Sequence, residues 1–201
     1  MDAILIHGMG RTPAAMSLLA ARLWRSNIRP HLFGYSVTFE RWDECIQRYK
    51  NFIEKRVQVN DYIIVGHSLG TVLTRAVLPD LLYKPKACFF LAPPTQVCGA
   101  ARIFAHQRLI KLFMGDVGRV LTNERFMQSL PLPDVPTKIY AGIAGPRGRY
   151  SPFGENFNDG LLTVKETILT GVPLQTVSVL HTFIMNSRVV TQDIVRLASQ
   201  A

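Results

Sequence analysis

One serine in the sequence lies in a setting that suits a nucleophile. Ser68 is the central residue of the pentapeptide Gly-His-Ser-Leu-Gly at 66–70, which follows the apolar run 62–65 and precedes a stretch with helical spacing. Strand, G-x-S-x-G and helix in this order form a sharp turn that holds the serine hydroxyl clear of its own backbone. The dipole and free N–H groups of the helix N-terminus favour developing negative charge there. The pentapeptide alone is a weak signal, but its context predicts a nucleophilic serine.

A glycine-containing turn follows the first apolar run of the chain. Residues 3–6 are apolar and lead into His-Gly-Met-Gly at 7–10. In a serine hydrolase, a His-Gly turn at a strand end carries half of the oxyanion hole, whose N–H groups bind the charged oxygen of a tetrahedral intermediate. We expect the backbone N–H groups of Met9 and Leu69 to be these donors. A simple glycine-rich turn or a fragment of a phosphate loop are the alternatives, although the full phosphate-loop patterns are missing.

With these two motifs in this order, the sequence resembles the α/β-hydrolase family, and within it the small lipase and esterase branch, over residues 3–198. In that family the acid of the catalytic triad follows the serine, and the histidine comes last. The resemblance implies that Asp159, within Asn-Asp-Gly, is the acid and that His181, after an expected strand at 174–180, is the base. His181 would then take the proton of Ser68, and Asp159 would hold the histidine ring in the required tautomer.

Other readings of these residues stay open on the sequence alone. Asn-Asp-Gly is also a common turn sequence, so Asp159 could be purely structural, and His181 could be a polar residue that ends a core strand. We expect His67 to pack beside the serine and His7 to order the oxyanion turn. The remaining histidines and two further aspartates are weaker candidates because of their places in the chain: His31, His106, Asp116 and Asp134.

Apolar runs and stretches with helical spacing alternate along the chain. The expected strands are 3–6, 31–35, 62–65, 87–92, 138–143 and 174–180. This alternation predicts an α/β fold, with a mostly parallel sheet of about six strands and helices on both faces. The resemblance implies an α/β-hydrolase-like sheet that lacks the two opening strands of larger members. We expect a single domain over residues 1–201.

Residues 95–135 interrupt this alternation. Their apolar residues are helically spaced, basic residues lie among them, and glycines break the run, so we expect two short helices or one bent helix. In α/β-hydrolases this stretch often carries a cap or lid over the site, which the resemblance implies here. An ordinary packing helix with solvated charges is the alternative.

Composition indicates a globular protein without a membrane-spanning segment. Of 201 residues, 48% are hydrophobic and 18% are charged, which excludes a disordered chain. No apolar run approaches the length of a membrane span, and no signal segment precedes the first strand, so we expect a cytoplasmic protein. Cys45, Cys88 and Cys98 are odd in number and lack metal-binding spacing. They indicate free thiols, and we expect no metal and no cofactor.

The chain is strongly basic. Lysine and arginine number 23 against 14 aspartate and glutamate residues, giving a net charge of +9. The basic residues are spread out and no nucleic-acid-binding motif accompanies them, so no nucleic-acid partner is expected. The charge indicates either a solvated basic surface or peripheral contact with an anionic membrane.

Together, the motifs and the resemblance predict a serine hydrolase that cleaves carboxylic esters through an acyl-enzyme intermediate. Its substrate would be a small-molecule ester or a lipid. A thioesterase or acyltransferase with the same triad is one alternative. A catalytically silent protein that binds a lipid or a partner is another, because a fold does not determine a function.

Overall fold

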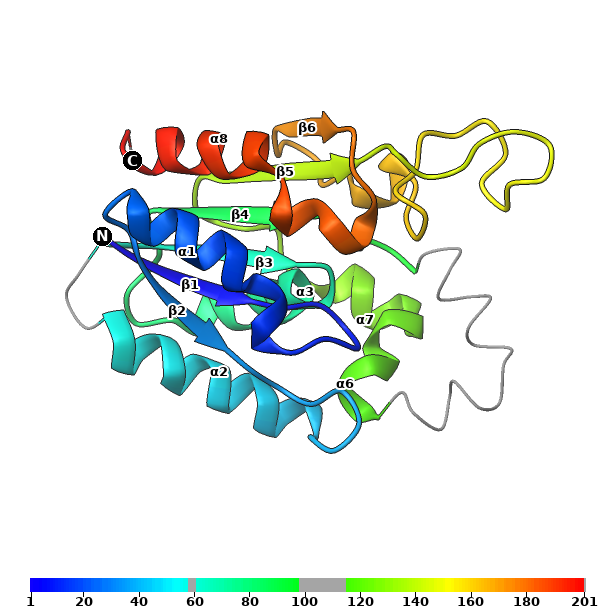
Figure 1. Cartoon of the computed structure of the whole chain (residues 1–201). Coiled ribbons are helices and arrows are strands. Elements are labelled where there is room, and N and C mark those ends of the chain that lie inside the picture. Colours follow the sequence, from blue (N-terminus) through cyan, green and yellow to red (C-terminus); the bar gives the residue numbers. More distant parts are fainter. Residues whose placement is uncertain (58–60, 98–114, 201) are drawn as a thin grey trace.

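The computed structural model describes residues 1–57, 61–97 and 115–200, which form one parallel sheet between two layers of helices (Figure 1). The strands of the sheet are β1 (Asp2–Ile6), β2 (Arg29–Phe33), β3 (Tyr62–His67), β4 (Ala87–Leu91), β5 (Thr137–Gly142) and β6 (Leu174–Val177). Their order in the six-stranded sheet is β2-β1-β3-β4-β5-β6, and every neighbouring pair is parallel. The predicted α/β class and six-stranded parallel sheet are confirmed.

The strand order reverses at β1, and this reversal determines where a site can form. The chain moves from β1 outward to the edge strand β2, then returns to β3 on the other side of β1 and continues to β6. In open parallel sheets, ligands bind at the carboxyl ends of the strands where the order reverses. The turns after β1 and β3, which carry the oxyanion motif and Ser68, meet at this point.

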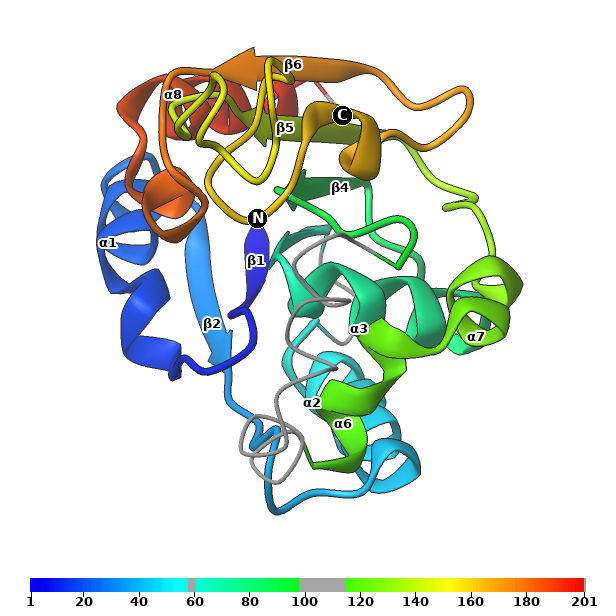
Figure 2. The ribbon, with the colours of Figure 1, turned by 90° about the vertical axis from the view of Figure 1, so that its right-hand side faces the viewer.

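The helices cover the two faces of the sheet (Figure 2). They are α1 (Ser17–Arg25), α2 (Trp42–Val57), α3 (Leu69–Val77), α6 (Asp116–Arg119), α7 (Glu124–Ser129) and α8 (Arg188–Ala198). Buried residues of α1 and α8 pack in one hydrophobic cluster, whereas those of α2, α3, α6 and α7 pack in another. The two clusters lie on opposite faces of the sheet because successive strand residues alternate between them.

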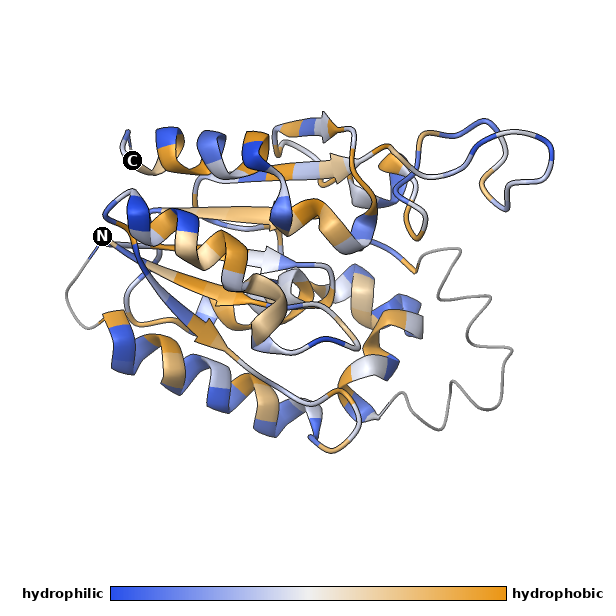
Figure 3. Cartoon of the chain, viewed as in Figure 1, coloured by the Kyte–Doolittle hydropathy of each residue, from blue (hydrophilic) through white to orange (hydrophobic). Residues whose placement is uncertain are grey.

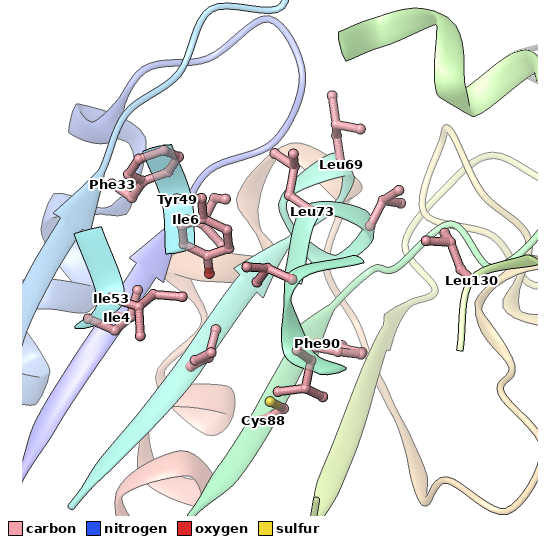
Figure 4. Close-up of a cluster of buried hydrophobic side chains, with 14 of the residues drawn as sticks. Ile4, Ile6, Phe33, Tyr49, Ile53, Leu69, Leu73, Cys88, Phe90 and Leu130 are labelled. Carbon is pink, nitrogen blue, oxygen red and sulfur yellow. The ribbon is translucent and has the colours of Figure 1, made fainter. Parts of the chain in front are cut away.

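The central strands are apolar on both sides. In β1, Ile4 and Ile6 belong to the cluster beside α2 and α3, while Ala3 and Leu5 belong to the cluster beside α1 and α8. Figure 4 shows Ile6 beside Tyr49 and Ile4 beside Ile53, both of α2. Figure 3 shows the apolar strands between helices with polar outer surfaces. Continuous burial of β1, β3 and β4 explains why these strands appear in the sequence as uninterrupted apolar runs.

The strand boundaries differ from the sequence prediction by one to three residues, and the second and last strands differ most. The second strand begins at Arg29, not at residue 31, and includes Pro30. A proline is tolerated there because β2 is an edge strand, so the missing N–H leaves no neighbouring strand without a donor. The last strand ends at Val177 instead of residue 180, and the chain then turns toward the 3-10 helix His181–Asn186.

The stretch from 95 to 135 is described only in part. Residues 98–114 lie outside the described residues, and with them Cys98 and His106. The described remainder contains α6 and α7, which agrees with short helical pieces. The Asp116 carboxylate of α6 accepts a hydrogen bond from the N–H of Trp42, at the start of α2. The Trp42 ring packs edge-on against Phe126 of α7, with 5.0 Å between ring centroids. These contacts fasten α6 and α7 to α2.

Candidate active site

Ser68 lies between the end of β3 and the first residue of α3, as the motif predicts. Its φ of 50° and ψ of −121° are unusual for a residue with a side chain, so the backbone is strained there. Three hydrogen bonds hold this conformation. The N–H of Ser68 donates to the carbonyl of Leu91 at 2.9 Å, and its carbonyl accepts from the N–H and hydroxyl of Thr71 at 2.9 and 2.7 Å. Strain of this kind is typical of functional sites.

Glycines allow the sharp turn at residues 66–70, the nucleophile elbow, to pack against the end of β1. A Cβ added at Gly70 would lie 2.7 Å from the carbonyl oxygen of His7 and 2.8 Å from that of Ile6. A Cβ added at Gly8 would lie 2.9 Å from Cβ of Ser68. Real Cβ atoms do not approach other atoms so closely, so both positions require glycine. The turn after β1 therefore touches the elbow directly.

His7 and Tyr35 order the turn that carries Met9, one of the two expected oxyanion donors. The His7 ring stacks on Tyr35 with 4.4 Å between centroids, and its Nδ1 donates to the carbonyl of Gly8 at 2.8 Å. The Tyr35 hydroxyl donates to the His7 carbonyl at 3.0 Å. Burial lowers the pKa of His7, which keeps the ring neutral in this role. Met9 follows Gly8, and Leu69 opens α3, where the helix does not use its N–H.

Asp159 and His181 form a buried pair. Asp159 Oδ2 lies 2.7 Å from His181 Nδ1, and Oδ1 accepts hydrogen bonds from the N–H groups of Leu161 and Leu162 at 2.9 and 2.7 Å. The N–H of His181 donates to the Asp159 carbonyl at 2.8 Å. The two residues come from the segments after β5 and β6, which end at the same edge of the sheet as β3. The carboxylate therefore fixes a proton on Nδ1 and leaves Nε2 as the basic nitrogen of the ring.

The turn around Asp159 depends on its neighbours in Asn-Asp-Gly. The Asn158 amide donates to the carbonyls of Pro146 and Asn156, and its oxygen accepts from the N–H of Gly160, which has a φ of 94°. Asn158 and Gly160 thus build the turn while Asp159 points to His181. Asn-Asp-Gly can therefore form a turn and also supply the expected acid.

His67 connects the elbow to the other two segments. It is buried, its Nε2 lies 3.1 Å from the carbonyl oxygen of His181, and the two rings are 4.9 Å apart. A Cβ added at Gly8 would lie 2.8 Å from His67 Nδ1. Burial, with His181 close by, lowers the pKa of His67 well below its ordinary value, so Nε2–H of a neutral ring donates to the carbonyl. The sequence predicted packing beside Ser68 but not this contact, because the partner is 114 residues away.

The structure brings Ser68, His67, Gly8 and His181 into one neighbourhood. Within the described part of the chain, the side chains of Ser68 and His181 are not hydrogen-bonded to each other. Such bonds between a nucleophile and its base are often long until a substrate binds. The arrangement can support attack by a serine hydroxyl with a histidine as general base and an aspartate behind it.

The weaker candidates lie elsewhere. His31 and Arg29 bind Asp2 at the amino end of β1, opposite the candidate site. Burial would raise the pKa of Asp2, but hydrogen bonds from Arg29 and His31 outweigh it and hold the pKa at about 2. Asp134 pairs with Lys84 at the surface. These residues stabilise the fold and do not approach Ser68.

The described part of the chain contains two of the three cysteines. Cys45 and Cys88 are free and buried, as predicted for free thiols. Burial raises the pKa of Cys45 to about 12 and also raises that of Cys88. The described ranges contain no group of three or more potential metal ligands. They also contain no helix long and apolar enough to cross a bilayer.

Comparisons with known proteins agree with this architecture. The profile of the alpha/beta hydrolase family matches residues 3–182. A lipase from Bacillus licheniformis, in its mature form, is 16% identical with a TM-score of 0.79, over 98% of this chain and 91% of that one.

Two further solved structures share the fold. A thioesterase of prodiginine biosynthesis from Streptomyces coelicolor is 15% identical with a TM-score of 0.66, over 100% and 90% of the two chains. A phospholipase from Legionella pneumophila is 16% identical with a TM-score of 0.61, over 84% of this chain and 45% of that one. A search of curated protein sequences found no match.

Proposed function

Because the chain belongs to the alpha/beta hydrolase family, we propose that it is a serine hydrolase that cleaves carboxylic esters through Ser68, His181 and Asp159. One observation carries the proposal: the buried 2.7 Å contact between Asp159 and His181. The His181 ring lies 4.9 Å from that of His67, the residue directly before Ser68, whose backbone is strained.

In the proposed mechanism, Ser68 Oγ attacks the ester carbonyl while His181 Nε2 takes its proton. Asp159 stabilises the imidazolium that forms and keeps the ring in position. The N–H groups of Met9 and Leu69 bind the oxyanion, and losing one such donor costs about 3–4 kcal/mol of transition-state stabilisation in comparable enzymes. His181 then protonates the leaving alcohol, and water hydrolyses the acyl-enzyme by the same route in reverse.

The proposed substrates are small-molecule esters or lipids. A lipase and a phospholipase are among the proteins of similar fold, which supports this class. A thioester substrate is the second candidate, because a thioesterase matches over the full length of the chain. The free thiols Cys45 and Cys88 support a reducing compartment, and we propose a cytoplasmic location.

Labelling with a fluorophosphonate probe tests the proposal. The probe reacts with a serine activated by an assembled base and oxyanion hole, so wild-type protein should be labelled and Ser68→Ala should not. Ser199→Ala, at an exposed position just after α8, is the matched control and should be labelled like the wild type. Folded wild-type protein that stays unlabelled would contradict the mechanism and favour the catalytically silent alternative.

Turnover assays separate the two substrate classes. Initial rates on p-nitrophenyl esters and on acyl thioesters of the same acyl length give kcat/KM for each. A higher value for the oxygen esters supports ester hydrolysis, whereas a higher value for the thioesters supports the second candidate. In either case Ser68→Ala should remove the activity, since both reactions use the same nucleophile.

A further inference from the structure

A basic groove lies between α1 and α8, on the face of the sheet opposite α2. Its volume is about 450 Å³, and its lining residues are Arg22, Arg25, Ser26, Arg188, Thr191, Gln192 and Val195. The residues of α8 in this list follow i, i+3, i+4, i+7 spacing, so they form one stripe along the helix. Arg22 and Arg25 face this stripe from α1.

The positive charge of the groove is not neutralised by neighbouring carboxylates. Arg22 donates to the backbone carbonyl of Asn186 at 2.7 Å, and the ion pairs among the described residues include neither Arg22, Arg25 nor Arg188. The carboxylate of α8, Asp193, is already bound by three other side chains. A guanidinium group can donate two parallel hydrogen bonds to two oxygens of one phosphate, so this groove suits a phosphate group.

The two helices also carry exposed apolar side chains, which lie outside the lining of the groove. On α1, Trp24 is 68% exposed and Leu18 is 46% exposed, while Val189 on α8 is 52% exposed. The inner sides of both helices are already buried in the core through residues such as Leu23 and Ile194. The outer apolar residues are therefore additional to those the fold needs.

The same face continues to the candidate active site. The 3-10 helix that begins at His181 packs against α1, and Phe183 on it is 53% exposed. In Figure 2 this helical turn lies beside α1, in front of α8. A surface that covered α1 and α8 would thus reach the segment that carries the proposed base.

We propose that α1, α8 and the 3-10 helix form a docking surface for an anionic membrane. Headgroup phosphates would enter the groove between the arginines, and Trp24 and Phe183 would enter the interfacial region, where aromatic side chains are stable. The net charge of +9 adds attraction to the negative surface of the bilayer. The exposed apolar side chains of α1 and α8 favour a membrane over a soluble phosphate compound, because only a nonpolar phase that covers them stabilises the bound protein through their burial.

Vesicle flotation tests the docking surface. Wild-type protein should float with vesicles that contain about one third phosphatidylserine and stay unbound with phosphatidylcholine alone. Each arginine removed should weaken binding about fivefold, so the triple variant Arg22→Gln, Arg25→Gln, Arg188→Gln should bind roughly 100-fold more weakly. Fluorophosphonate labelling or circular dichroism of the variant checks that it is folded.

A charge-matched variant on the opposite face is the control. Lys50→Gln, Lys55→Gln, Arg56→Gln on α2 removes the same charge, far from the groove. This control should bind vesicles within a few-fold of wild type, because attraction from the far face is screened over about 10 Å. Equal losses in the two triple variants would overturn the proposal and leave only a general effect of charge.

Tryptophan fluorescence reports which part of the molecule meets the lipid. The variant Trp42→Phe leaves Trp24 as the emitter, and its emission should shift to the blue on addition of anionic vesicles. The variant Trp24→Phe leaves Trp42, which packs against Phe126 on the other face, and its emission should stay unchanged.

Three further results would overturn membrane docking. One is a failure of the wild-type protein to bind anionic vesicles. Another is displacement of the protein from vesicles by millimolar inorganic phosphate, which would make the groove a site for soluble phosphate. The third is binding to RNA that depends on the groove arginines and matches the vesicle affinity. Because these assays do not use catalysis, their failure is separate from failure of the proposed hydrolase activity.

Discussion

Replacing Asp159 by asparagine tests the proposed triad through the tautomer of His181. In the native protein Oδ1 of Asp159 accepts two backbone N–H groups, from Leu161 and Leu162, and Oδ2 faces His181 Nδ1. An asparagine offers one oxygen and one NH₂ group for these two places. If the oxygen stays with the two N–H groups, the NH₂ group faces Nδ1. That nitrogen must then accept, so the ring proton moves to Nε2 and His181 cannot take the serine proton.

The size of the expected loss in kcat/KM follows from the free-energy cost of the opposite orientation of the new side-chain amide at position 159. Turning the amide to restore the correct tautomer would place the NH₂ group against the N–H groups of Leu161 and Leu162. Two hydrogen bonds would be lost and two donors left unpaired, which costs about 2–4 kcal/mol. The productive tautomer would then be populated roughly 30- to 1,000-fold less. Loss of the charge that stabilises the imidazolium adds to this, so we expect kcat/KM to fall by about 10⁴.

Kinetics, stability and NMR together check this reasoning. The assay is kcat/KM on a p-nitrophenyl ester, with ¹⁵N-edited NMR to assign the tautomer of His181. The free energy of unfolding should change little, because the backbone hydrogen bonds are kept. The variant Asp134→Asn, at a surface ion pair, is the matched control and should keep wild-type activity. An Asp159→Asn protein with turnover within tenfold of wild type, or with its proton on Nδ1 of His181, would refute the argument.

Three further predictions concern the packing around the site. Gly70→Ala places a Cβ against two backbone carbonyls at the end of β1 and should destabilise the protein by about 1–3 kcal/mol in urea unfolding, with loss of probe labelling. The lowered pKa of His67 means that the unfolded state binds a proton first as pH falls below about 6.5. The free energy of unfolding should therefore drop as the pH falls from about 7.5 to 5.5, by on the order of 1 kcal/mol, and His67→Gln should remove that component. In a Cys98→Ala protein, Cys45 and Cys88 should stay unreactive toward a thiol reagent near pH 8 until urea unfolds the chain, since burial raises both pKa values.

The parts of the structure that the sequence predicts are those determined by local patterns. The elbow at Ser68 is encoded within a few residues, because a strand, two glycines and a helix must meet around it. The parallel sheet follows from alternation of strands and helices, since such connections have few allowed topologies. Asp159 and His181 were predicted from their order in a family, and the structure places them 2.7 Å apart. Their catalytic roles remain predictions.

The contacts that could not be predicted join residues far apart in the sequence. The hydrogen bond of His67 to His181 depends on where the segment after β6 turns back, and that strand is shorter than its apolar residues indicate. Tyr35 stacks on His7 across 28 residues, and nothing near either residue marks the pair. The start of β2 was predicted two residues too late, after Pro30. A proline is tolerated in this strand because the strand lies at the edge of the sheet, which is a property of the whole sheet.

The candidate site is assembled by close backbone approach more than by side-chain packing. Gly8 and Gly70 let the turn after β1 touch the elbow, and Gly142, at the end of β5, lies where a Cβ would be 2.7 Å from Cβ of Asp159. The distances between the proposed donors, nucleophile and acid are therefore determined by how closely strand ends can approach. A methyl group at any of these glycines would separate two catalytic segments while leaving the apolar clusters in place. Activity should for this reason be more sensitive than stability to substitution at these positions.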